Sequence, residues 1–435
     1  MTMQTVLPVD LSAVAALSSL TGEPEWMAAL RRESLELAAN LPLPKLEKTR
    51  IERWPLDDFG SYKESPRLKS AMDLPAEVRR FIGDAEKAGN LLVQRNSSVV
   101  YAALSDDVAA KGVVFTGLSE ALAEHGELIR RHFMKAVARD ENRLTALHAA
   151  MWSGGVFLYV PKNVKVEVPL QALFLSDDAS ASFCPHVLIV ADENSEVTYV
   201  DNYFNYNASG KLVHNGVVEI FAKPGAHVQF ASVHDLSAGV TDLTYRRAVL
   251  ENGARIDWII GEMNNGHSMS DTASILKGEG SVSDAKVICV GTGDQRMNIT
   301  TRAVHIGRHT VSDMITRAVM RDNSTAIING ITKIEKGATY ASGEQTERVL
   351  MLSPTARGDA NPMLLIDEDE VKAGHAASVG QVNPEHVFYM MSRGITREAA
   401  LRLIIYGFLA PVVSEIPIRI LEEQLKLVVE RKLGQ

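Results

Sequence analysis

The residues best placed to do chemistry in this sequence surround a single histidine, His375. It lies among the small residues Gly374, Ala376, Ala377 and Ser378, and no cysteine is near it. A neutral imidazole is a competent ligand for iron and other transition metals, and small neighbours leave room for a bound group. The alternative is a histidine that only forms hydrogen bonds within its own segment. The residues by themselves leave both interpretations open.

The two cysteines of the chain, Cys184 and Cys289, are far apart and stand in apolar, strand-like runs. They fit neither a zinc motif nor a disulfide framework, so we expect two small buried side chains in a reducing compartment. The sequence also lacks a nucleotide-binding phosphate loop, an HExxH motif, a GxSxG motif and a dinucleotide fingerprint. These absences argue against the common nucleotide-dependent and hydrolytic enzymes.

From about residue 155, short strand-like runs follow one another without a helical pattern between them. They are rich in Val, Ile, Tyr, Phe and Thr and are separated by Gly, Asn or Asp. The motif Thr-Arg-Ala-Val occurs at 301–304 and again at 316–319. The series indicates a right-handed parallel β-helix, or β-solenoid, whose coils stack about 4.8 Å apart. A β-sandwich or jelly roll is the alternative with a similar texture.

Helical patterns flank the strand region on both sides. On the N-terminal side, apolar periodicity predicts helices in three places, 24–41, 75–88 and 119–150. We therefore expect a mainly β protein with three parts. These are an N-terminal helical domain at 1–150, a β-helix core at 151–382 and a C-terminal helical domain at 383–435.

The C-terminal helices have clear start and stop signals. Asn383 and Pro384 predict an N-cap and a first helical residue, and Thr396 caps a second helix that is expected to end near Gly407 and Pro411. A last amphipathic helix has an apolar stripe formed by Ile418, Leu421, Leu425 and Val428. Helices of this kind either cap the terminal coils or present part of their apolar surface to a partner protein.

A solenoid has an edge problem, because its terminal coils expose unpaired backbone groups. An open coil can pair with another chain by strand addition. This gives a physical reason to expect a dimer.

Composition excludes several classes of partner. The chain has 435 residues, of which 46% are hydrophobic and 23% are charged, and a formal net charge of -9. A negative balance argues against nucleic acid, which requires a basic face. No apolar run has the roughly 20 residues of a membrane span, and the N-terminus lacks the features of a signal peptide. We expect a cytoplasmic protein.

The segment at 373–417 resembles the C-terminal signature of the SufB/SufD family, which takes part in iron–sulfur cluster assembly. It reads AGHAASVGQVNPEHVFYMMSRGITREAALRLIIYGFLAPVVSEIP, and the preceding segment at 332–375 is similar to the family as well. The resemblance covers most of 155–435 and is most specific in 329–417. It implies a β-helix core between helical domains and work in a complex with the ATPase SufC. The resemblance thus implies that the partner supplies nucleotide hydrolysis, which agrees with the lack of a phosphate loop in this chain.

Within the family, the chain is more similar to SufD-like than to SufB-like members. It has Asp359 and Ala360 where SufB-like members carry a cysteine, and Ala373 and Gly374 where some SufD-like members carry Cys-Ser before the histidine. The family's histidine is therefore present as His375 without an adjacent thiol. The resemblance implies a transient cluster shared between His375 and a thiolate of SufB, and no cofactor held stably by this chain.

The resemblance also places the SufC-docking region in the helices around Arg393, Gly394, Ile395 and Arg397. It implies a non-catalytic, SufD-type scaffold subunit of a complex with SufB and SufC, with the SufB contact at the β-helix edge. Two alternatives belong to other classes. A β-helix carbohydrate-active enzyme is expected to have an export signal and acidic or basic residues aligned on successive coils, and neither is evident. A structural homodimer that binds SufC is the second.

Overall fold

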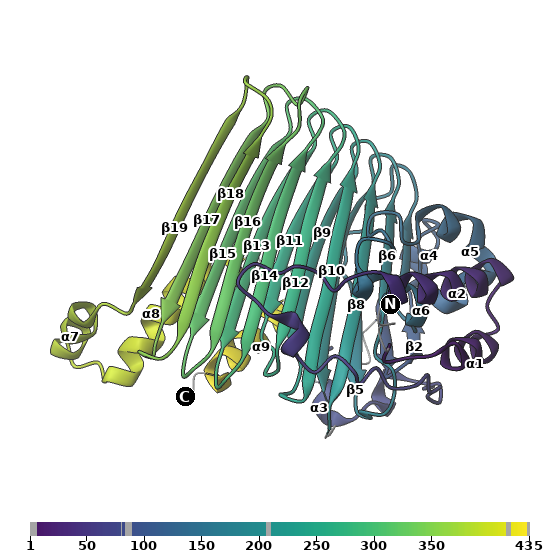
Figure 1. Ribbon diagram of the computed structural model, residues 1–435, viewed down its shortest axis with the longest axis horizontal. Coiled ribbons are helices and arrows are strands. Elements are labelled where there is room, and N and C mark those ends of the chain that lie inside the picture. Colours follow the sequence, from purple (N-terminus) through teal and green to yellow (C-terminus); the bar gives the residue numbers. More distant parts are fainter. Residues whose placement is uncertain (1–6, 80, 83–88, 206–209, 415–418, 433–435) are drawn as a thin grey trace, which may run out of the picture.

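A computed structural model describes residues 7–79, 81–82, 89–205, 210–414 and 419–432. Figure 1 shows a long solenoid of stacked strands with the N-terminal helices gathered at one end and α7 beyond the other. Within the described ranges, no helix combines the length and the apolar composition that crossing a membrane requires.

The N-terminal part contains helices, but it also contributes strands to the solenoid. The helices predicted from 24–41 and 119–150 are present, the second as two separate helices; the segment at 75–88 is described only in part. Three strands at 91–117 were not predicted: β1 and β5 pair in parallel, and β3 pairs with β4 antiparallel. The elements are α1 (Leu11–Thr21), α2 (Glu25–Asn40), α3 (Ala76–Arg79), β1 (Leu91–Arg95), β2 (Ser98–Ala103), α4 (Asp106–Ala109), β3 (Val114–Gly117), α5 (Leu118–His132) and α6 (Arg143–Met151), with single 3-10 turns at Ile51–Arg53 and Ala71–Asp73.

The predicted β-solenoid is confirmed. Sixteen further strands alternate between two sheets, and each pairs in parallel with the strand two places along the chain. They are β4 (Val156–Val160), β5 (Leu170–Ser176), β6 (His186–Ala191), β7 (Glu196–Asn205), β8 (Leu212–Ala222), β9 (His227–Asp235), β10 (Val240–Leu250), β11 (Arg255–Glu262), β12 (Ser268–Leu276), β13 (Val282–Gly291), β14 (Arg296–His305), β15 (Val311–Met320), β16 (Thr325–Ile334), β17 (Ser342–Met351), β18 (Arg357–Ile366) and β19 (Lys372–Gln381).

The repeated Thr-Arg-Ala-Val motif marks half a coil rather than a whole one. Its first copy lies in β14 and its second in β15, which belong to different sheets. From β4 onward, residues that stack are 26 to 32 positions apart; Val282, Val311 and Ser342, for example, are separated by 29 and 31 positions. The 15-residue offset therefore carries the chain from one sheet to the other, and two such steps complete a coil.

The hydrophobic core fills the space between the two sheets. Side chains alternate along each strand, so every second residue points inward and stacks on the inward residues of the coils before and after it. In β17, for example, Gly343, Gln345, Glu347 and Val349 are buried, while Glu344 and Arg348 are exposed. The register therefore decides which side chains meet inside the solenoid.

The C-terminal helices are α7 (Pro384–Ser392), α8 (Arg397–Val413) and α9 (Arg419–Lys432). The predicted caps are confirmed, because the side chains of Asn383 and Thr396 accept hydrogen bonds from the first turns of α7 and α8. The predicted end of the second helix is slightly wrong, since α8 continues through Pro411 to Val413. A proline in the last turn removes only one hydrogen bond near the end of the helix.

The helices α8 and α9 cover the outer face of the ten-stranded sheet instead of closing its terminal coil. Their apolar side chains, among them Ile405, Leu409 and Val429, pack against strand residues such as Ile288 and Val319. Of the stripe predicted on the last helix, Val428 is buried there. Ile418 and the side chains of Leu421 and Leu425 lie outside the described residues. The last coil is thus left without a cap among the described residues.

Candidate functional site

The terminal coil consists of β18 and β19, which end the nine-stranded and the ten-stranded sheet respectively. His375 lies on β19, where it pairs in register with Gln345 of β17. The imidazole is exposed, whereas Gln345 is only 2% exposed. Side chains in register on adjacent parallel strands point to the same face. His375 therefore faces the interior side of the solenoid and is exposed because no further coil covers it.

Among the described residues, no strand pairs with the outer edge of β19, which therefore offers a row of free backbone N–H donors. The N–H of Lys372 donates to the carbonyl of Ala341, back toward β17, over 2.9 Å. Backbone N–H groups alternate between the two sides of a strand, and the pairing of β17 with β19 is unbroken. The N–H groups that face the open edge are therefore those of Ala373, His375, Ala377, Val379 and Gln381.

The edge of β18 differs because it contains Pro362. The N–H of Arg357 donates to the carbonyl of Ser324 on the previous coil, so the N–H groups of the odd-numbered residues of β18 point back toward β16. Pro362 is at an even-numbered position, and its missing N–H lies on the open side. Proline at such a position is tolerated in an edge strand and interrupts pairing with a further strand. Of the two edges, that of β19 therefore has the more complete row of backbone N–H groups for pairing with an added strand.

One coil below His375, Glu347 on β17 is 2% exposed. Neither of its carboxylate oxygens has a hydrogen-bond partner among the described residues. Burial raises the pKa of Glu347 to about 7, against the opposing effect of the nearby backbone N–H of Gly330. Sequence reasoning missed this residue, although Glu347 shares its alternation with the apolar Val349.

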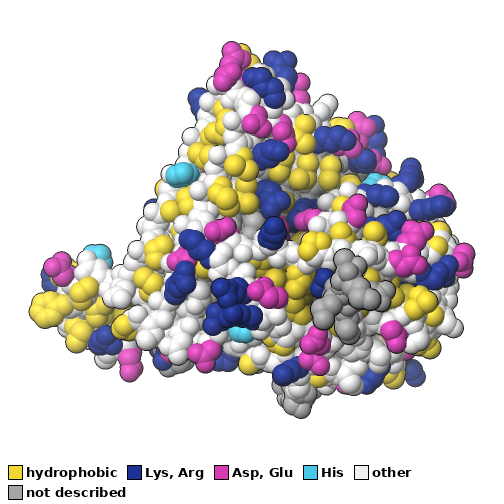
Figure 2. Space-filling model, in the orientation of Figure 1, with side chains coloured by type: hydrophobic (Ala, Val, Ile, Leu, Met, Phe, Trp, Pro, Cys, Tyr) yellow, Lys and Arg dark blue, Asp and Glu magenta, His cyan; other side chains and the backbone are white. Residues whose placement is uncertain are grey.

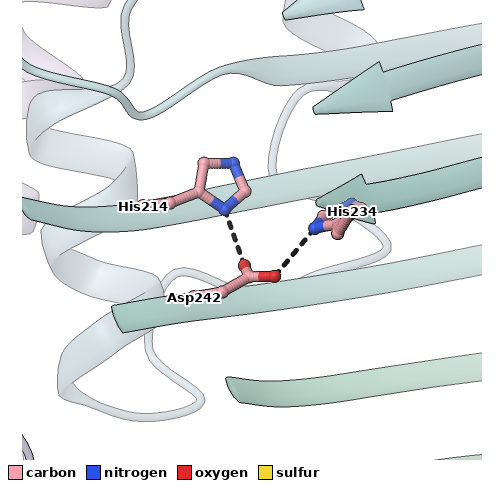
Figure 3. A group of neighbouring side chains, drawn as sticks. All are labelled: His214, His234 and Asp242. Carbon is pink, nitrogen blue, oxygen red and sulfur yellow. Dashed lines mark hydrogen bonds and ion pairs between the residues drawn. The ribbon is translucent and has the colours of Figure 1, made fainter. Parts of the chain in front are cut away.

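A second set of ligand-type side chains lies deep in the solenoid. Figure 3 shows His214 on β8 and His234 on β9, both turned toward Asp242 on β10. The Nδ1 atoms of His214 and His234 lie 2.7 and 2.8 Å from the two carboxylate oxygens of Asp242. The hydroxyl of Thr244 and the side-chain amide of Asn264 donate to the same carboxylate over 2.8 and 2.6 Å. We call these five residues the Asp242 cluster.

The hydrogen bonds of the Asp242 cluster do not suit a metal ion. Arg246 donates to Nε2 of His234 over 2.8 Å, so that nitrogen accepts and Nδ1 carries the proton toward Asp242. A metal on Nδ1 would instead leave the proton on Nε2, facing the guanidinium. Burial opposes the charge on Asp242, yet His234 and His214 hold the pKa of its carboxyl well below its usual range. Of the four ring nitrogens in the cluster, only Nε2 of His214 lacks a hydrogen-bond partner among the described residues, so we interpret the cluster as a structural network.

Another buried chain of polar groups joins the N-terminal helices to the solenoid. Nε2 of His148 on α6 lies 3.0 Å from Nδ1 of His186, whose Nε2 lies 3.2 Å from the carboxylate of Glu219. Glu219 also accepts from the backbone N–H groups of Met134, Ala136 and Val137. These contacts fix the helices to β6 and β8.

Neither cysteine lies at the open end. Cys184 and Cys289 are buried, as predicted, and burial raises the pKa of each thiol to about 12. The reactive form of cysteine is the thiolate, so neither side chain is available to an external metal at neutral pH.

The residues expected to bind a partner lie around the turn between α7 and α8. Arg393, Gly394 and Arg397 are exposed and Ile395 is half-buried. Gly394 has a φ of 85°, which explains a glycine at the end of α7. A cavity of about 910 Å³ lies between these helices and the ends of β15, β17 and β19, and Arg397 is among the residues that line it.

Apolar side chains gather on α7, at the left of Figure 2. Phe388 is 73% exposed, Tyr389 59% and Met391 45%. Large apolar side chains exposed together mark a surface that binds another protein more often than one that faces water. The predicted partner residues therefore lie beside an apolar patch formed by Phe388, Tyr389 and Met391.

Comparison with known protein families identifies the family to which this chain belongs. The model described as SUF system FeS cluster assembly, SufBD core domain, matches residues 174–408, and that of the SufBD protein N-terminal region matches 24–172. The chain therefore belongs to the SufB/SufD family of the SUF iron–sulfur cluster assembly system.

The relatives agree with the more specific resemblance. The iron–sulfur cluster assembly protein SufD of Bacillus subtilis is 45% identical over 100% of both chains. SufB of the same organism is 30% identical over 95% of this chain and 91% of its own. A SufBD family protein of Staphylococcus epidermidis is 29% identical over the same shares. The chain is thus more similar to SufD than to SufB of one organism, as the sequence predicted.

Proposed function

We propose that this chain is a non-catalytic scaffold subunit of a cytoplasmic complex with SufB and the ATPase SufC. In this complex an iron–sulfur cluster is assembled at the open end of the solenoid and then released. The observation that carries the proposal is the uncapped terminal coil, in which His375 and the free edge of β19 lie together.

Strand addition to β19 supports SufB as the partner at this end. A related solenoid has terminal strands of its own, and pairing two edges satisfies the backbone groups of both. The interruption at Pro362 directs the pairing toward β19. The same edge also suits a second copy of this chain, so a homodimer is the alternative.

The thiolate ligands of the cluster come from the partner in this proposal. The chain has two cysteines, and both are buried with raised pKa values. An exposed imidazole at the edge supplies a single ligand, and iron–sulfur clusters are held mainly by thiolates. Nucleotide hydrolysis comes from SufC, whose contact we assign to Arg393, Gly394, Ile395 and Arg397 beside the apolar patch of α7.

The edge contact is tested with a pair of prolines in β19. Val379→Pro removes an N–H that faces the open edge, whereas Ser378→Pro removes one that pairs with β17. Co-expressed with SufB and SufC, Val379→Pro is expected to give a folded chain that no longer co-purifies with SufB. The Ser378→Pro control should lower thermal stability instead. A Val379→Pro chain that retains SufB would contradict the edge contact.

A further inference from the structure

Glu347 has an unusual environment for a charged residue. Its side chain is 2% exposed, and among the described residues neither carboxylate oxygen has a hydrogen-bond partner of good geometry, although the backbone N–H of Gly330 is nearby. Burying a carboxylate in this way is costly, and such groups in proteins normally have a protein, water or ion partner. Its side chain lies over Gly330 of the facing sheet, where an added Cβ would come within 1.9 Å of Oε1. The absence of a side chain at Gly330 makes room for the carboxylate inside the coil.

The position of His375 brings an imidazole toward the same interior space. His375 stacks on Gln345, and Glu347 is two residues further along β17 on the same face. With strands about 4.8 Å apart and about 3.3 Å between residues, their Cα atoms are separated by about 8 Å along the diagonal. At that separation the side chains of a histidine and a glutamate are both long enough to meet a common ion, once the carboxylate of Glu347 turns from Gly330 toward the last coil.

Among the described residues, the strands β17 and β19 place no competing cation on the interior side near this pair. Ala377, which stacks directly on Glu347, is small and exposed, so only one residue of the last coil separates the carboxylate from solvent along its ladder. The other inward positions of the two strands are all uncharged: Gly343, Gln345, Val349, Met351, Ala373, Ala377, Val379 and Gln381. This contrasts with the guanidinium that faces His234 in the Asp242 cluster.

We propose that Glu347 and His375 form the inner half of a binding site for a divalent first-row transition ion, which in the cell is Fe²⁺. The carboxylate neutralises part of the charge and the imidazole supplies a nitrogen ligand, a combination suited to iron, cobalt and manganese. The remaining positions stay open toward the edge, where a partner's side chains complete the set. The choice of iron rests on the proposed function; the metal-binding pair does not.

The test uses the full-length, metal-free chain and Co²⁺, whose visible absorption reports its ligands, with Fe²⁺ measured by anaerobic equilibrium dialysis. Glu347→Gln keeps the shape of the side chain and His375→Ala removes the imidazole. Each is expected to weaken binding by at least about tenfold and to change the Co²⁺ spectrum. The matched controls are Glu344→Gln, on the outer face of the same strand, and His386→Ala, exposed on α7.

The outcomes separate this inference from the proposed function. Wild-type affinity and spectrum in Glu347→Gln would overturn the role of Glu347, and loss of binding in the controls as well would overturn the site as a whole. Binding of SufB and SufC is measured on the same variants. Failure of the unsubstituted chain to bind either protein would overturn the proposed function, whatever the metal titration shows.

Discussion

The Asp242 cluster and the terminal coil contain the same kinds of side chain in two different settings. In the cluster, the carboxylate of Asp242 accepts four hydrogen bonds and coils lie on both sides. In the terminal coil, the carboxylate of Glu347 has no such donor among the described residues, and His375 is exposed. The comparison teaches that polar residues inside a solenoid are structural when most of their hydrogen-bonding atoms have partners. They become candidates for binding where the stack ends.

The largest expected effect is on folding stability in the closed region. Asp242→Ala leaves the buried donors of His214, His234 and Asn264 without an acceptor. Breaking a buried network in this way costs about 3–5 kcal/mol of unfolding free energy. Urea unfolding followed by circular dichroism measures it. Glu347→Ala, the matched change at the open end, should not lower stability, and an equal loss in both variants would remove the distinction.

Asp201 shares a feature with each region. It is buried inside closed coils, as Asp242 is, and burial raises its pKa to about 6 from 3.8, as burial also raises the pKa of Glu347. The folded state then binds more protons than the unfolded state between about pH 4 and 6. Stability should therefore fall as pH rises through that window, by up to about 3 kcal/mol. Asp201→Asn should remove this fall and be more stable than the unsubstituted chain at pH 8. Equal pH profiles for the two proteins would show that Asp201 titrates normally.

A smaller effect is expected on the surface beyond the terminal coil. Phe388→Ser removes the most exposed member of the apolar patch on α7 without disturbing the core. Affinity for SufC should fall by about tenfold, in line with loss of about 1–2 kcal/mol from one aromatic contact. Stability should stay within about 0.5 kcal/mol. The affinity is measured by titrating the chain onto surface-immobilised SufC. Unchanged binding would place the ATPase contact elsewhere.

Much of the fold could be predicted from the sequence, because the strand runs from 155 to 262 are β-rich and separated by turn residues. They correspond to β4 through β11. The early strands β1 to β3 were missed because they are short and stand among helices. The cap residues Asn383 and Thr396 were predictable, since their local chemistry does not depend on distant contacts.

The candidate site was only partly predictable. The position of His375 in the last coil followed from the change of pattern at Asn383. The partners of each histidine did not, because they depend on register between strands whose paired residues are 26 to 32 positions apart. Glu347 has an alternation signal shared with Val349, but only the pairing of β17 with β19 shows that His375 lies diagonally above it.

The most direct test of the account measures iron and sulfide in the reconstituted complex. The chain is assembled with SufB and SufC and loaded anaerobically, with His375→Ala compared against His386→Ala. The account predicts that both variants assemble normally, that the His386 variant keeps its full cluster content, and that the His375 variant loses most of it. Full cluster content in a complex assembled with His375→Ala would contradict the central claim that the open end of the solenoid is the functional site.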